Sequence, residues 1–162
     1  MNPHPGPAQS VSAIRAAVSR RADDIIAWTK RFVSFPSENR PPQGFEAAAQ
    51  RWIAAECRAR GWDVDVFSPP AVRGIRKHRS WLDGRHYPRG RDNVVARWRG
   101  SGRGPSILLS GHADVAPSEP AQWKACRPYK PVVRNGRLYG RGAADMKGGL
   151  AAMFWAMRIL QE

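Results

Sequence analysis

A short apolar run that leads directly into polar side chains is the feature that most limits the folds open to this chain. Residues 106–110 read Ser-Ile-Leu-Leu-Ser, and residues 111–114 read Gly-His-Ala-Asp. A strand with such a continuous apolar centre suits a buried central position in a sheet, so we expect a strand over 106–110. Because residues i and i+2 of an extended chain point to the same side, His112 and Asp114 can project together from its C-terminal end.

Helical periodicity is the second clear pattern. Apolar side chains recur every three, four or seven residues from Val18 to Phe35, where Pro36 stops the pattern, and a second helix is expected from about Gly44 to Arg60. A third helix is expected near the end of the sequence, because apolar residues occupy positions i, i+3, i+4, i+7 and i+10 of one stretch: Leu150, Met153, Phe154, Met157 and Leu160.

Further strands are predicted between these helices. Alternation close to period two indicates strands at Trp62–Phe67 and Asn93–Trp98. Residues Val132–Tyr139 predict a hairpin, with Asn135-Gly136 as its type I′ turn. The resulting order, helix–helix–strand–strand–strand–hairpin–helix, predicts the α/β fold class.

Length and cysteine usage set the domain organisation and the compartment. With 162 residues the chain can form one domain with a core, which we place at 14–162. Residues 1–13 contain several prolines and no apolar segment of a secretion signal, so we expect a disordered leader. Cys57 and Cys126 lie far apart, without the spacing of a zinc-thiolate site, and the expected location is the reducing cytoplasm. No apolar run approaches the roughly 18 residues of a membrane span.

The net charge of +14 raises the question of an anionic partner. Arginines occur along almost the whole chain, which is typical of a solvated, Arg-rich surface, and we therefore do not expect a nucleic-acid partner. One stretch, residues 73–91, is more concentrated and keeps a specific anionic partner open as an alternative. Its basic residues are Arg73, Arg76, Lys77, Arg79, Arg85, Arg89 and Arg91.

Asp145 is the second candidate for the chemistry that His112 indicates. It follows a Gly-Arg-Gly turn at 140–142 and precedes the last predicted helix. A carboxylate there can bridge two cations, but Asp is also a common helix N-cap, and both interpretations stay open on the residues alone. A phosphate cradle is disfavoured, because the glycines match neither the dinucleotide-binding nor the Walker A spacing.

Taken together and in order, these motifs resemble the metallopeptidase M20 family, which includes acetylornithine deacetylase, succinyl-diaminopimelate desuccinylase, aminoacylase and glutamate carboxypeptidase. The resemblance is close over roughly the last 75 residues and loose over the first 70. The segments that carry it are Arg91–Ala96, Ser110–Pro117, Trp123, Arg127–Pro131 and Asn135–Gly149.

The resemblance implies a fold and a metal site. The family fold is a catalytic α/β domain, with a mixed sheet between helices, interrupted by a smaller dimerisation domain. By motif position His112 would bind one zinc, Asp145 would bridge two zincs, and Asp114 would be the catalytic residue that orients His112. Cobalt or manganese could replace zinc, since the ligand types suit several divalent ions. The peptide bond after Asp145 would be cis.

The implied reaction is hydrolysis of an amide in a small N-acyl amino acid or peptide. In the family the general-base glutamate and further metal ligands lie beyond the position of Glu162. We therefore expect an N-terminal fragment of a di-zinc metallohydrolase, lacking the C-terminal part and the dimerisation domain, that is inactive alone. We also expect an exposed apolar patch around Met153, Phe154 and Met157, and a complementary C-terminal chain or a homodimer as partner.

Two other functions remain as alternatives. The first is a non-catalytic half-domain that binds a partner, and the second is a basic nucleic-acid-binding protein, whose binding would depend steeply on salt. No membrane partner is expected.

Overall fold

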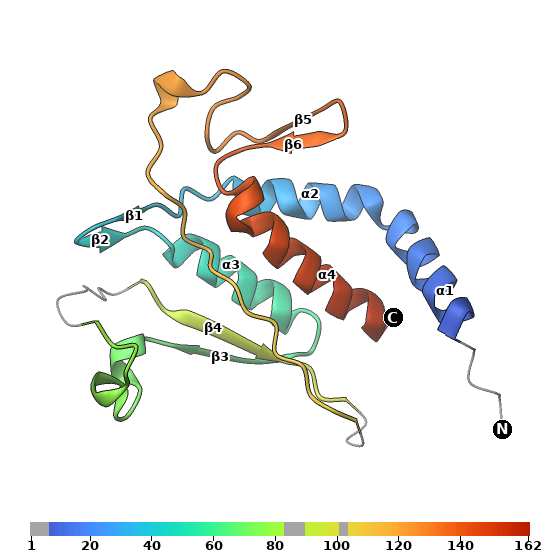
Figure 1. The fold of residues 1–162 in the computed structure, drawn as a ribbon, viewed down its shortest axis with the longest axis horizontal. Helices are drawn as coiled ribbons and strands as arrows, with labels where there is room; N and C mark the ends of the chain where they lie inside the picture. The colour runs from blue at the N-terminus through green and yellow to red at the C-terminus, as the bar shows by residue number, and fades with distance from the viewer. Residues whose placement is uncertain (1–6, 83–89, 101–103) are drawn as a thin grey trace.

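The structure is a computed structural model that describes residues 7–82, 90–100 and 104–162 (Figure 1). These residues form helices and small antiparallel sheets, which confirms the predicted α/β class. The α-helices are α1 (Pro7–Arg20), α2 (Ala22–Val33), α3 (Ala47–Arg58) and α4 (Gly148–Gln161). The strands are β1 (Asn39–Arg40), β2 (Gln43–Gly44), β3 (Asp63–Phe67), β4 (Asn93–Arg97), β5 (Val132–Arg134) and β6 (Arg137–Tyr139).

Helix α3 lies between the β3–β4 pair and the other helices (Figure 1). Strands β3 and β4 pair antiparallel from Asp63 opposite Arg97 to Phe67 opposite Asn93. The strands β1 and β2 form a second pair, and β5 and β6 form a third. The last is the predicted hairpin: Asn135 and Gly136 have φ values of 50° and 70°, as a type I′ turn requires.

An aromatic cluster joins α2, α3 and α4. Trp28 stacks on Phe154 with ring centroids 4.5 Å apart, and it lies 4.7 Å from Trp52. Trp62, which precedes β3, completes the cluster 5.4 Å from Phe154. Phe154 is only 6% exposed, so the prediction of an exposed apolar patch is wrong for this residue. Met153 and Met157 are half-buried and line a groove instead.

The N-terminal helices differ from the sequence expectation. The helix predicted over 18–35 is interrupted at Arg21, where α1 ends and α2 begins. Residues 7–13 of the expected disordered leader belong to α1, and residues 1–6 lie outside the described residues. The apolar side chains Val11, Ile14 and Val18 of α1 are all strongly exposed.

The central strand expected at Ser106–Ser110 is wrong. The segment is not in a strand, and Ile107 and Leu108 are 76% and 88% exposed. A continuous apolar run is buried only when other strands pair with it and helices cover it, and no strand within the described ranges pairs with this segment. A groove of about 540 Å³ separates it from β4 and is lined further by α3 and α4.

Candidate metal centre

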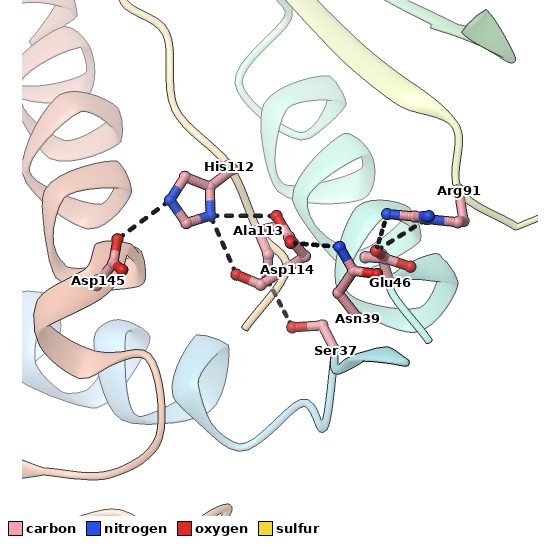
Figure 2. Close-up of polar contacts among 8 residues, drawn as sticks. All are labelled: Ser37, Asn39, Glu46, Arg91, His112, Ala113, Asp114 and Asp145. Carbon is pink, nitrogen blue, oxygen red and sulfur yellow. Dashed lines mark hydrogen bonds and ion pairs between the residues drawn. The ribbon is translucent and has the colours of Figure 1, made fainter. Parts of the chain in front are cut away.

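The imidazole of His112 lies between the carboxylates of Asp145 and Asp114 (Figure 2). Its Nε2 is 3.1 Å from Oδ1 of Asp145, and its Nδ1 is 3.1 Å from Oδ1 of Asp114. The backbone oxygen of Asp114 is also 3.1 Å from Nδ1. The structure thus brings all three residues proposed from the sequence together, although Asp145 comes from a part of the chain 33 positions away.

The site is open to solvent. The side chain of Asp145 is 88% exposed and that of His112 is 49% exposed. A pocket of about 370 Å³ has Asn39, Asp114 and Pro117 among its lining residues, together with this pair. The imidazole and the Asp145 carboxylate are therefore accessible to a small ligand or a metal ion.

The turn before α4 places Asp145 beside His112. Gly142, with φ of 77°, leads into a kinked turn at Ala143–Lys147, in which Asp145 has the non-helical values φ −125° and ψ 98°. The Asp145–Met146 peptide is cis, as the resemblance implied. Lys147, and not Asp145, occupies the N-cap position of α4, so the alternative in which Asp145 is that helix's N-cap is wrong.

The turn and the His112 segment pack closely against each other. A side chain at Gly111 would meet Met146, because a Cβ atom there would lie 2.7 Å from its Cε. On the far side of the turn, Lys147 is completely buried, and its Nζ donates a hydrogen bond of 2.7 Å to the backbone oxygen of Phe35. Burial lowers the pKa of Lys147 to about 8. Arg141 supports the same region by donating to the backbone oxygen of Pro117 at 3.3 Å.

A second segment, residues 37–39, runs alongside the His112 segment and holds it in place. Val115 donates its N–H to the oxygen of Ser37, and Asn39 donates its N–H to the oxygen of Val115, both at 2.9 Å. The buried hydroxyl of Ser37 donates to the oxygen of Ala113 at 2.6 Å. This role could not be predicted from the sequence, because Ser-Glu-Asn matches no motif and the two segments are about 75 residues apart.

Glu38, at the centre of that segment, anchors the loop that follows the site. Its buried carboxylate accepts hydrogen bonds from the backbone N–H and hydroxyl of Ser118, from the hydroxyl of Tyr129 and from Arg40. Burial alone would raise the pKa of Glu38, but these donors outweigh it and lower the pKa to about 2. The loop that contains Ser118 and Tyr129 is therefore hydrogen-bonded to Glu38 through both backbone and side-chain groups.

The donors fit zinc in kind but not in number. Imidazole nitrogen and carboxylate oxygen are both zinc ligands, and a carboxylate on the other ring nitrogen is the usual support for a metal-bound histidine. A catalytic zinc normally has three protein ligands, however, and no cluster of three or more His, Cys, Asp or Glu suited to a metal occurs in the parts of the chain that the structure covers. His112 and Asp145 therefore amount to a partial ligand set.

Other candidate features lie apart from this centre. In the basic stretch 73–91, Arg73, Arg76, Lys77 and Arg79 are exposed, whereas Arg91 pairs with the buried carboxylate of Glu46 at 2.9 Å. Arg85 and Arg89 lie outside the described residues. None of the described helices combines the length and the apolar character needed to cross a bilayer.

Comparison with known proteins finds a family match and several similar proteins. Residues 108–162 match the sequence profile of peptidase family M20/M25/M40. The N-formyl-4-amino-5-aminomethyl-2-methylpyrimidine deformylase of Bacillus subtilis is 29% identical over 95% of this chain and 32% of its own length. The succinyl-diaminopimelate desuccinylase of Leptothrix cholodnii is 52% identical over 69% of this chain and 25% of its own length.

The fold agrees with these matches. Human carnosine dipeptidase 1 superposes with a TM-score of 0.73 at 18% identity, over 93% of this chain and 31% of the dipeptidase. The chain thus spans only between a quarter and a third of the length of these three relatives. The family match over residues 108–162 and the identity to these relatives show that this chain belongs to the M20 peptidase family.

Proposed function

We propose that this chain supplies the N-terminal part of a two-zinc centre that hydrolyses an amide bond in a small N-acyl amino acid or peptide. The observation that carries the proposal is the approach of His112 Nε2 and Asp145 Oδ1 to 3.1 Å, with Asp114 on the other ring nitrogen. The relatives named above as a desuccinylase and a deformylase support the choice of an acyl amide as substrate class.

Each of the three residues has a distinct role in this proposal. His112 would hold one metal ion, and Asp145 would be a carboxylate ligand shared by two ions. Asp114 would keep a proton on Nδ1, which leaves the Nε2 lone pair free for the metal. When bound, the zinc ions polarise the amide carbonyl and lower the pKa of a water molecule. Cobalt or manganese would suit the same donors.

The proposal also includes a partner. Hydrolysis needs a general base, and none is assigned among these residues, so the chain alone is expected to be inactive. We propose that a complementary C-terminal chain, or the corresponding part of a longer protein, provides the base and the remaining ligands. The exposed apolar side chains of Ile107 and Leu108, beside the groove next to β4, support an additional strand at this position. On cysteine usage alone, the proposed compartment remains the cytoplasm.

A complementation assay tests the proposal. The chain would be expressed with the part of the Leptothrix cholodnii desuccinylase that lies beyond the matched residues, loaded with zinc, and assayed on a panel of N-succinyl, N-acetyl and N-formyl amino acids. We expect hydrolysis by the pair, none by either part alone, and none by a pair that carries His112→Ala. Zinc-dependent turnover by this chain alone would contradict the expected inactivity, and turnover by the His112→Ala pair would contradict the assigned centre.

A further inference from the structure

We propose that Asn39 is a positioning residue for the candidate metal centre, because its side-chain amide fixes the carboxylate that in turn orients His112. Nδ2 of Asn39 donates a hydrogen bond of 3.2 Å to Oδ2 of Asp114. The other oxygen of that carboxylate, Oδ1, is 3.1 Å from Nδ1 of His112 (Figure 2). This inference rests on the proposed function, since it assigns a role in the same centre.

The chemistry of the two groups determines the direction of this contact. An ionised carboxylate only accepts hydrogen bonds, so the amide must present its NH2 group and not its oxygen. A guanidinium would partly neutralise the negative charge of Asp114. The amide donor of Asn39 is uncharged, so it holds the carboxylate without this effect. The full charge of the carboxylate therefore remains available to Nδ1 of His112. Arg40, the neighbouring cation, is directed instead to Glu38.

The position of Asn39 is fixed from both sides. Its own backbone N–H donates to the oxygen of Val115, directly after Asp114. Its neighbour Glu38 is buried and bound to Ser118 and Tyr129, and Ser37 is bound to Ala113. The backbone of Asn39 is thus already hydrogen-bonded to the segment that contains Asp114. A side chain held in this way loses little additional freedom when it forms the contact.

Asn39 also lines the 370 Å³ pocket that contains His112 and Asp145. Direct contact with a bound ligand is therefore the competing role for this residue. The two roles differ in the free chain: a positioning residue changes the state of His112 when no ligand or metal is present, whereas a ligand-binding residue does not.

The test is the tautomer of His112 in the metal-free chain, measured from the ring ¹⁵N chemical shifts at one fixed pH at which the imidazole is neutral. In the wild type Asp114 at Nδ1 and Asp145 at Nε2 compete for the ring proton, so each variant is compared with the wild-type ratio of the two tautomers. In Asn39→Ala the ratio of Nδ1–H to Nε2–H should fall by about two- to tenfold, the effect of one ordinary hydrogen bond. Asn39→Asp, which has the same shape but no NH2 donor and an added negative charge, should change the ratio too. In an Asp114→Ala background, Asn39→Ala should add no further change.

A matched control and a fold check complete the design. Gln43→Ala removes an exposed amide from the strand opposite Arg40 and should leave the ratio unchanged. Circular dichroism identifies any variant that fails to fold, and Asn39→Asp provides the measurement if Asn39→Ala is one of them. An unchanged ratio in folded Asn39 variants, or an equal change in the Asp114→Ala background, overturns the inference. Failure of the complementation assay with a normal tautomer response would contradict the proposed function and leave the positioning role standing.

Discussion

The ammonium group of Lys147 donates to the backbone oxygen of Phe35 over 2.7 Å and ties the turn that carries Asp145 to the end of α2. The side chain is completely buried, and Nζ also lies 5.3 Å from the ring centroid of Phe32. A charged group is therefore kept in the interior by a single carbonyl and an aromatic face. The contact is two residues from Asp145, so it lies within the turn that carries this residue.

The stability of the metal-free chain should depend on pH through Lys147. Its folded pKa of about 8 is lower than the value of 10.5 for the free side chain, so the unfolded state binds more protons between these two values. Stability should therefore rise from about pH 8 to pH 10.5, by up to about 3 kcal/mol, and stay flat for this group below pH 8.

The measurement is urea unfolding across this pH range for the wild type and for Lys147→Met, which keeps the length of the side chain. The variant should lose the rise that the wild type shows. Parallel curves for the two proteins would contradict this account of Lys147.

Acid should weaken the fold through Glu38. Its pKa is lowered from the usual 4.5 to about 2 in the folded chain, so its contribution to stability is fully present above pH 4.5 and is lost as the pH falls from there through 2. We expect Glu38→Gln to cost about 1–3 kcal/mol at pH 7, because it replaces an ionised acceptor of several hydrogen bonds.

The difference between wild type and Glu38→Gln, measured by denaturant unfolding, should shrink below pH 4.5. Glu119→Gln, which alters an exposed carboxylate directly after Ser118, is the matched control and should have little effect. A difference that stays constant down to pH 2 would show that charge is not the origin of the effect.

The aromatic cluster should dominate the stability of the fold. Phe154→Ala removes a buried ring that stacks on Trp28 and contacts Trp62, and we expect it to lower the free energy of unfolding by about 3–5 kcal/mol. Leu160→Ala on the same helix, at a residue 60% exposed, should change it by less than about 0.5 kcal/mol. Comparable effects in thermal unfolding of the two variants would contradict the assignment of the core.

The segment at 106–110 should control association and not stability. Leu108→Lys places a charge on a side chain that is 88% exposed, so the unfolding free energy should stay within about 0.5 kcal/mol of the wild type. The same change should reduce aggregation of the isolated chain, measured by light scattering, and should abolish complementation. A large loss of stability would mean that the segment is buried after all.

The parts of the fold that local sequence determines could be predicted, and those that depend on distant neighbours could not. Helix α4 and the Asn135-Gly136 hairpin follow from periodicity and turn chemistry within a few residues. The pairing of His112 with Asp114 follows in the same way from i and i+2 spacing in an extended segment. Each of these needs no knowledge of the rest of the molecule.

The failures have a different cause. The apolar run at 106–110 indicates burial, but burial also requires strands beside it, and no described strand pairs with it. The anchoring of the site by Ser37 and Asn39 joins residues about 75 positions apart and leaves no pattern in the sequence. The meeting of His112 with Asp145 was expected only from the family resemblance, because spacing alone could not bring them together.

The most direct test of the central claim is zinc binding by the purified chain, measured by isothermal titration calorimetry at pH 7. We expect His112→Ala and Asp145→Ala each to weaken zinc binding by about tenfold or more, since each removes a proposed ligand. His78→Ala, at an exposed histidine elsewhere in the chain, should bind zinc as the wild type does. Wild-type affinity in both the His112→Ala and Asp145→Ala variants, or zinc binding that is lost only in His78→Ala, would contradict the claim.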